Sequence, residues 1–460
     1  MSLPLNGRVA IVDDVYEQAE PIMRALAKHQ IPYTFYKGAD PRFLPEKDSR
    51  YNDIRLLFLD INLLDDKAVP NEKQIRSALI YALERILSPD NFPYSIIFWS
   101  RHQEEHSQLI IDIFSNELKD RKPILFKGFV KSDFFPNYSS EEVENNIDLK
   151  DEIEKIIEQQ EAYSQLLVWE NQVHLSADTT LQDLFSSYHK YEHWSDNANY
   201  IVKKLAKAYL EKHINEVSSR EIIRSSFYSL NAVFKDYLES SIRNLKISDG
   251  MLFDFDKKRI VVETKFINRR INISETFIDK KESGCILIGD KLPTINLEKI
   301  VSFRKLKEDA KTKLLLEGHK IEESRLDKIL TEEAFKSKHF LIEDIKRDIV
   351  NIALVVTPIC DFAQKNNVLD RIVSGGLIPT SFRESIDDRS EAIYILPISL
   401  CYEQKDYILL LDFRYFSTTD LNSEIVKPIS RIRQELLAEI QSKLSRHINR
   451  QGILFLDERV

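Results

Sequence analysis

Short apolar runs alternate with segments of helical periodicity across residues 1–137. The apolar runs cover 8–12, 32–36, 55–60, 94–99 and 123–130. Segments with apolar residues at helical spacing cover 17–30, 71–87 and 106–120, and a polar, proline-containing crossover covers 39–53. Apolar runs joined through helices are typical of parallel strands that are buried on both faces. We therefore expect an α/β fold with a doubly wound parallel sheet in this part of the chain.

The pattern becomes helical between residues 138 and 247. Apolar residues recur at helical spacing among many charges, and no proline or glycine interrupts the chain between Asn137 and Asp249. We expect one helix over 141–172 and a new helix that begins at Asp178 as its N-cap. This all-α segment is interpreted as a connector, and a dimerisation bundle that would make a homodimer is an equally good interpretation.

Residues 248–460 mix both patterns. Strands are predicted over 251–256, 258–266, 284–290, 351–358, 391–400 and 405–416, a charged helical stretch over 307–349, and a terminal helix over 429–452. These elements indicate an α+β, β-barrel-like C-terminal domain. The motif TPxCDxxQ, the strand LLLDFR and the helix end RQG resemble an uncharacterised bacterial domain, and the resemblance implies no activity.

Polar side chains stand where the predicted parallel strands end. Asp13 and Asp14 follow the first run and Asp60 follows the third, while Ser100 and Lys131 follow the fourth and fifth. In open α/β sheets the carboxyl ends of the strands meet at one edge, where ligands bind. Carboxylate oxygens suit Mg²⁺, and a hydroxyl and an ammonium suit a phosphoryl group. The pattern predicts a site for both at this edge.

The order of these residues resembles the receiver domain of two-component response regulators, over residues 1–137. The resemblance implies a flavodoxin-like fold in which Asp60 accepts a phosphoryl group from a sensor histidine kinase. It also implies that Asp13, Asp14 and Asp60 hold Mg²⁺. Ser100 and Lys131 would contact the phosphoryl oxygens. The alternative is a flavodoxin-like domain whose acidic strand ends are solvated turns.

The chain departs from the receiver pattern in three places. Arg101 follows Ser100 where the family has a small residue, and Ser132 follows Lys131 where the family has proline. Lys127 lies on the same predicted strand as Lys131 and competes for the lysine role. We expect Arg101 to shield an acyl phosphate from water, and we favour Lys131 because the strand ends there.

Composition restricts the binding partners and the cellular compartment that we expect for this protein. The net charge of −9 provides no basic field for nucleic-acid binding. Only three cysteines occur, without CxxC spacing, which favours a reducing compartment. No leader and no apolar stretch long enough to cross a membrane is apparent. We therefore expect a cytoplasmic protein.

The chain resembles the atypical receivers of two-component-like bacterial anti-phage systems of the Detocs type. That resemblance implies a phosphorelay with a kinase and a second response regulator or effector as partners. It also implies a phosphate-buffer role for this chain, because no effector chemistry is visible after the receiver.

Two other functions stay open at this stage. Glu263 and Lys265, after Asp254 and Asp256, are arranged like the acidic and lysine residues of metal-dependent nucleases, so the C-terminal domain is a candidate effector enzyme. Because such a triplet in an alternating strand is common by chance, solvated side chains explain it equally well. A scaffold that never becomes phosphorylated is the third class.

Overall fold

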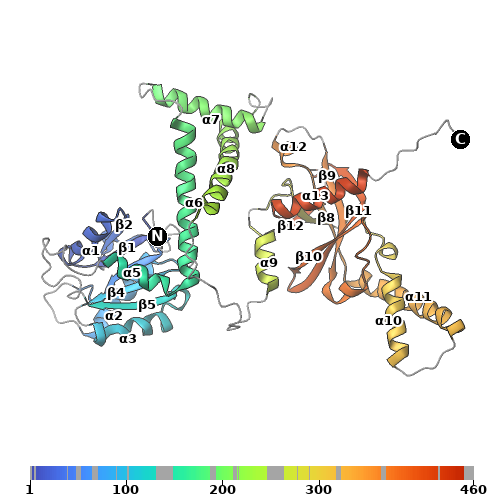
Figure 1. The fold of residues 1–460 in the computed structure, drawn as a ribbon, viewed down its shortest axis with the longest axis horizontal. Coiled ribbons are helices and arrows are strands. Elements are labelled where there is room, and N and C mark those ends of the chain that lie inside the picture. Colours follow the sequence, from blue (N-terminus) through green and yellow to red (C-terminus); the bar gives the residue numbers. More distant parts are fainter. Residues whose placement is uncertain are drawn as a thin grey trace. The chain divides into compact units, whose positions relative to one another are not determined.

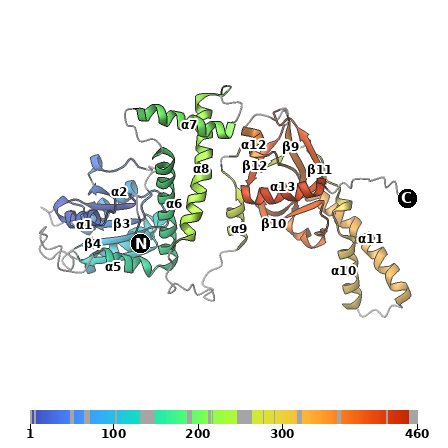
Figure 2. The same cartoon turned by 45° about the horizontal axis from the view of Figure 1, so that its top comes forward.

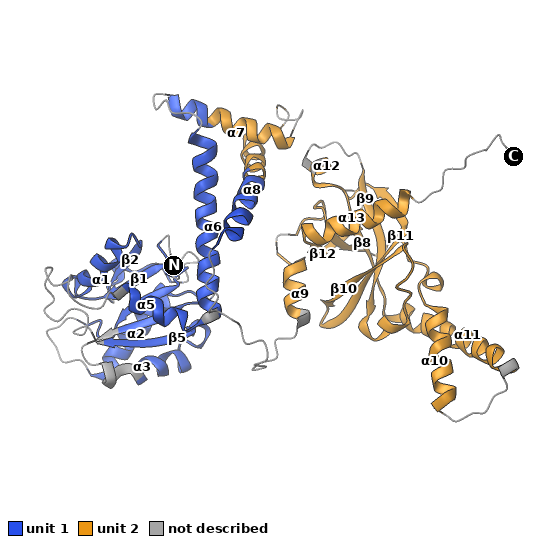
Figure 3. Cartoon of the chain, in the orientation of Figure 1, with its two compact units in different colours: residues 1–198, 230–255 blue, residues 199–229, 256–460 orange. Residues whose placement is uncertain are grey.

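The computed structural model describes most of the chain. The described residues are 3–4, 7–38, 40–47, 53–64, 71–89, 91–100, 103–130, 149–186, 193–210, 215, 217–245, 264–276, 278–289, 291–316, 323–363, 369–422 and 425–449. The chain divides into two compact units: residues 1–198 with 230–255, and residues 199–229 with 256–460 (Figure 3). The predicted domain boundaries after residues 137 and 247 lie outside the described residues.

The first unit contains a parallel five-stranded sheet (Figure 1). Its strands are β1 (Val9–Asp13), β2 (Tyr33–Lys37), β3 (Leu56–Asp60), β4 (Ser95–Ser100) and β5 (Leu125–Val130). The order is β2-β1-β3-β4-β5, and all neighbours are parallel. This is the flavodoxin-like order, in which the chain reverses direction across the sheet between β1 and β3. The predicted parallel sheet is confirmed.

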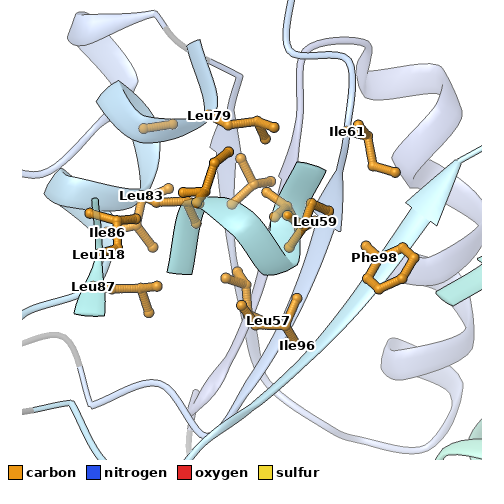
Figure 4. Close-up of a cluster of buried hydrophobic side chains, with 14 of the residues drawn as sticks. Leu57, Leu59, Ile61, Leu79, Leu83, Ile86, Leu87, Ile96, Phe98 and Leu118 are labelled. Carbon is orange, nitrogen blue, oxygen red and sulfur yellow. The ribbon is translucent and has the colours of Figure 1, made fainter. Parts of the chain in front are cut away.

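Helices cover both faces of this sheet because successive strand residues point to opposite faces and almost all are apolar. Leu57 and Leu59 of β3 pack with α2 (Glu72–Ile86) and α3 (Gln103–Asn116) (Figure 4). Leu56 and Phe58 point to the other face, toward α1 (Tyr16–Lys28) and α5 (Leu149–Glu158). In the described part of the crossover between β2 and β3, the 3₁₀ turn η1 (Pro41–Phe43) is the only helical element.

Hydrogen bonds connect helix α6 (Glu161–Ser186) to the amino-terminal edge of the sheet. Glu170 accepts hydrogen bonds from Arg8 at 2.5 Å and from Nε of Arg55 at 3.1 Å. Arg8 and Arg55 directly precede β1 and β3, the two strands that end in carboxylates. The Tyr163 hydroxyl donates to the Arg55 carbonyl, and burial raises the pKa of Tyr163. The start of α6 therefore belongs to the hydrophobic core between the first sheet and helices α1 and α5.

The helical segment differs from the prediction in two places. The predicted helix over 141–172 is interrupted between α5 and α6, where 159 and 160 form a turn. Asp178 does not cap a new helix, because α6 continues through it to Ser186. No glycine or proline stops the helix at that point, so propagation adds one hydrogen bond per residue. Helices α7 (Trp194–Leu210) and α8 (Ser219–Arg243) follow.

The second unit contains a curled antiparallel sheet of seven strands. The order is β10-β11-β9-β8-β7-β12-β6. The strands are β6 (Ile273–Ser274), β7 (Cys285–Ile288), β8 (Val350–Val355), β9 (Asp370–Pro379), β10 (Ile393–Tyr402), β11 (Lys405–Thr419) and β12 (Lys427–Ile432). The predicted strands over 284–290, 351–358, 391–400 and 405–416 are confirmed by β7, β8, β10 and β11.

Helices pack on both faces of this second sheet. Helix α13 (Gln434–Asn449) lies against the sheet (Figure 2), where it packs with Leu409 and Leu411 of β11. Residues of α10 (Phe303–Leu316) and α11 (Glu323–Asp348) pack with Ile408 and Leu410. Shorter elements are η2 (Lys119–Arg121), η6 (Leu297–Lys299), α12 (Ile359–Ala363) and η7 (Thr380–Ser385).

No helix in the described part of the chain is long and apolar enough to cross a membrane.

Two predictions for the C-terminal region are wrong. Of the strand predicted over 258–266, residues 258–263 lie outside the described residues, and 264–266 belong to helix α9 (Thr264–Asn272). In α9, Ile267 and Ile271 lie four residues apart, which is a helical spacing, and no strand pairing involves 264–272. The terminal helix does not begin at residue 429, because 427–432 form β12 between β7 and β6. Tertiary pairing overrode the helical spacing of this short segment.

Candidate metal and phosphoryl site

The structure brings three carboxylates together at the point where the first sheet changes direction. Asp13 ends β1 and Asp60 ends β3, and the pairing of Val12 with Leu59 places these two residues side by side. One side-chain oxygen each from Asp13, Asp14 and Asp60 lies within 4.8 Å of the other two. Asp13 is 2% exposed, Asp60 is 8% exposed and Asp14 is half-buried. The predicted meeting of these residues is thus observed.

Backbone amides hold two of these side chains in place. Oδ1 of Asp13 accepts the N–H of Val15 at 3.0 Å, which closes the turn into α1. Oδ1 of Asp60 accepts the N–H of Ile61 at 2.7 Å. Hydrogen bonds from amides favour the ionised carboxylate. Both carboxylates are therefore oriented by the chain before any ligand arrives.

Three carboxylates at this spacing, two of them buried, repel one another unless positive charge lies among them. Two unit charges 4.8 Å apart repel by about 3.5 kcal/mol at an effective dielectric constant of about 20. Desolvation of the two buried groups adds to that cost. An oxygen-only donor set of this kind suits a hard divalent cation such as Mg²⁺ or Ca²⁺. These residues could hold such an ion.

The residue that follows β2, Gly38, also lies against the carboxylate cluster. The sequence analysis did not identify it. Gly38 has φ of +53°, and its N–H donates to the Asp13 carbonyl at 3.0 Å. A Cβ on Gly38 would lie 2.8 Å from Cβ of Asp14 and 3.5 Å from the Leu63 carbonyl oxygen. The only available signal was a glycine directly after a strand, in a chain with few glycines. Gly38 lets β2 approach both loops that carry the carboxylates.

A fourth carboxylate near the end of β2 is directed to another partner. Asp40 caps η1 through the N–H of Arg42 and pairs with its guanidinium, with Nη2 to Oδ2 at 2.7 Å. The side-chain hydrogen bond from Arg42 lowers the pKa of Asp40 to about 2. Asp40 is thus committed to Arg42.

The remaining predicted site residues are only partly described. Ser100 ends β4 and pairs with Val130, so its backbone lies at the carboxylate edge. Lys127 pairs with Ile97, two positions before the level of Asp60, and is exposed. Lys131 and Arg101 lie outside the described residues, so the roles of Lys131, Lys127 and Arg101 stay predictions.

Of the residues proposed for nuclease chemistry, the structure describes only the backbone of Lys265. Asp254, Asp256 and Glu263 lie outside the described residues. Lys265 is in the first turn of α9. Its backbone is therefore helical, and the strand on which that interpretation depended is absent from 264–272.

Comparison with known proteins identifies no relative. The chain has no significant match to a protein-family model, to a curated protein or to a solved structure.

Proposed function

We propose that the first unit is a receiver-like module in which Asp60 accepts a phosphoryl group and Asp13, Asp14 and Asp60 hold Mg²⁺. The observation that carries this proposal is the approach of the three carboxylates within 4.8 Å at the ends of β1 and β3. Their place at the switch point of the sheet, where α/β proteins bind ligands, supports it.

The chemistry assigned to Asp60 is nucleophilic. One carboxylate oxygen attacks the phosphorus of a donor, such as a phosphohistidine, and forms an acyl phosphate. The bond from phosphorus to the imidazole nitrogen breaks, and its electron pair stays on the imidazole. A bound Mg²⁺ would neutralise charge on the phosphoryl oxygens during transfer.

Labelling with a small phosphodonor tests this function. The full chain is incubated with acetyl phosphate, with Mg²⁺ or with excess chelator, and its intact mass is measured. We expect a mass gain of one phosphoryl group with Mg²⁺ and none with chelator. A gain of the same size in both samples, or no gain in either, would contradict the proposal.

The partner implied by this function is a sensor histidine kinase, and a second response regulator or effector would receive the output. The placement in bacterial anti-phage signalling and the role as a phosphate buffer remain parts of this proposal. The effector-nuclease alternative was based on a strand that carries Lys265, but the backbone of Lys265 is helical.

Gly38→Ala should weaken metal binding at this site about tenfold. The new Cβ would displace Asp14, because two non-bonded carbon atoms cannot stay 2.8 Å apart. Residues that orient metal ligands typically change affinity 10–100-fold. Mg²⁺ requires near-ideal octahedral geometry and Ca²⁺ does not, so the affinity for Mg²⁺ should fall more than that for Ca²⁺. Calorimetric titration of both ions measures the ratio.

Gly7→Ala is the matched control. Gly7 also has positive φ, at +76°, but a Cβ there meets nothing within 4 Å. Both variants carry the backbone strain of alanine at positive φ. Equal Mg²⁺ to Ca²⁺ affinity ratios in the two variants would show that Gly38 does not position Asp14.

A further inference from the structure

Helix α7 carries a basic face, which consists of Tyr200, Lys203, Lys204 and Lys207. An α-helix has about 3.6 residues per turn, so positions three and four residues apart lie on the same side. All four side chains are exposed, and Tyr200 is 58% exposed. The only acidic residue of α7, Asp196, lies in its first turn. The basic face therefore presents positive charge alone.

The opposite face of α7 packs on the start of α8 (Figure 2). The Leu205 carbonyl accepts a hydrogen bond from the hydroxyl of Ser229 at 2.8 Å. The rings of Tyr209 and Tyr228 stack with their centroids 4.9 Å apart. Both of the α7 residues in these contacts come two positions after a lysine of the basic face, which is about 200° around the helix. The packing that holds α7 therefore leaves the lysines uncovered.

The lysines of the basic face keep their full charge. Among the residues that the structure describes, no carboxylate pairs with Lys203, Lys204 or Lys207. On other helices of the chain, exposed lysines do pair with carboxylates one turn away, as Lys443 does with Glu439 at 3.0 Å. Because this compensation is missing in α7, the basic face is open to an anionic ligand.

The charge of this region is opposite in sign to that of the whole chain. The chain has a net charge of −9, but residues 199–229, which belong to one compact unit, contain six basic and three acidic residues. At an ionic strength of about 0.1 M, exposed charges more than about 10 Å apart are largely screened from each other. A ligand that touches the basic face therefore meets the local positive charge and not the net charge of the chain.

The composition of the basic face selects among anionic partners. Protein interfaces have apolar or aromatic centres from which lysine is depleted, and no apolar side chain lies among these lysines. A helix that lies on a membrane inserts its apolar side, but on α7 the apolar residues Ala206 and Leu210 are buried. A row of lysines instead matches the closely spaced phosphates of a nucleic-acid backbone.

We propose that the basic face of α7 binds the phosphate backbone of duplex DNA without reading its bases. Each of the three ammonium groups contacts one phosphate and releases its condensed counterion. Nζ of Lys204 lies 5.1 Å from the ring centroid of Tyr200, so the face offers charge and not a platform on which unpaired bases stack. The proposal concerns α7 only and does not depend on phosphoryl transfer at Asp60.

Titration of the full chain against a short fluorescent DNA duplex tests this proposal. We expect a Kd of roughly 100 μM or tighter at about 0.05 M salt. Three phosphate contacts give a slope of about −2.7 for log K against log salt concentration, so the affinity should fall about 40-fold between about 0.05 and 0.2 M salt. Duplexes of different sequence should bind alike. One separated strand should bind more weakly, because its charge density is lower.

Substitution of the three lysines assigns binding to the basic face. The triple variant Lys203→Gln, Lys204→Gln, Lys207→Gln should weaken binding at least about tenfold at about 0.05 M salt and remove most of the salt dependence. Glutamine has nearly the helix propensity of lysine, so α7 should stay folded, which circular dichroism checks.

The matched control is the triple variant Lys311→Gln, Lys313→Gln, Lys328→Gln. It removes three exposed lysines of α10 and α11 and changes the net charge equally, so it should leave DNA binding unchanged. The proposal would be overturned by an absence of saturable duplex binding at about 0.05 M salt, by equal losses in the two triple variants, or by tighter binding to the single strand. Lysine-dependent binding to phosphatidylserine vesicles by a chain that does not bind the duplex would overturn it as well.

Discussion

Asp60→Asn should abolish phosphoryl uptake, with a loss of at least about 100-fold in the rate of labelling by acetyl phosphate. The amide has nearly the shape of the carboxylate but lacks a nucleophilic oxygen anion. Its Oδ1 can still accept the N–H of Ile61, so the end of β3 should keep its conformation. Intact mass after incubation with Mg²⁺ and acetyl phosphate measures the loss, and far-ultraviolet circular dichroism checks the fold.

Asp53→Asn is the control for this experiment. Asp53 lies near the start of β3, at the opposite end of the strand from Asp60, and its side chain is 64% exposed. Its substitution should leave phosphoryl uptake unchanged. If Asp60→Asn is labelled as fast as Asp53→Asn, the nucleophile is another residue.

Asp412→Asn should destabilise the second sheet by about 3 kcal/mol. The Asp412 side chain is 0% exposed and pairs with Arg414. Removal of one partner of a buried ion pair typically costs about 3–5 kcal/mol. We expect the low end because the Arg414 side chain is 29% exposed and keeps access to water. In the variant, an N–H of the asparagine side chain would face Nη2 of Arg414. In the native protein, an aspartate oxygen accepts a hydrogen bond from Nη2 at 2.7 Å. Hydrogen exchange of the amides of β9 and β11 measures the local free energy of opening.

Asp388→Asn provides the comparison in the same unit. Asp388 pairs with Lys305 at 3.3 Å, but its side chain is 57% exposed. Exposed ion pairs contribute about 0–1 kcal/mol, so exchange should accelerate far less. Equal acceleration in the two variants would mean that burial of Asp412 does not set the stability of β11.

The first sheet and its carboxylate cluster could be predicted because local and tertiary signals agree there. The apolar run 55–60 can only be buried on both faces, and its single carboxylate, Asp60, comes at the end of the strand. Parallel pairing then places Asp60 beside Asp13, since strand ends of a parallel sheet share one edge. The identities of these residues were sufficient, without knowledge of the register.

The sequence-based predictions fail where tertiary contacts determine the secondary structure or the role of a residue. Residues 264–272 and 427–432 are short, so few apolar positions were available to distinguish a helix from a strand. The role of Gly38 depends on the closeness of Asp14, which lies 24 residues earlier in the chain (38 − 14). Likewise, the strand LLLDFR did not reveal the Asp412–Arg414 pair, because the loss of ladder pairing opposite Ser374 is a property of three strands together.

Chemical trapping of the labelled residue identifies the side chain that accepts the phosphoryl group. Borohydride reduces an aspartyl phosphate to homoserine, so peptide mapping after acetyl phosphate, Mg²⁺ and borohydride locates the acceptor. We expect homoserine at position 60, dependent on Mg²⁺, with Asp13 and Asp14 unmodified. Homoserine at position 13 or 14, or phosphate on a serine or another side chain while position 60 stays aspartate, would contradict it.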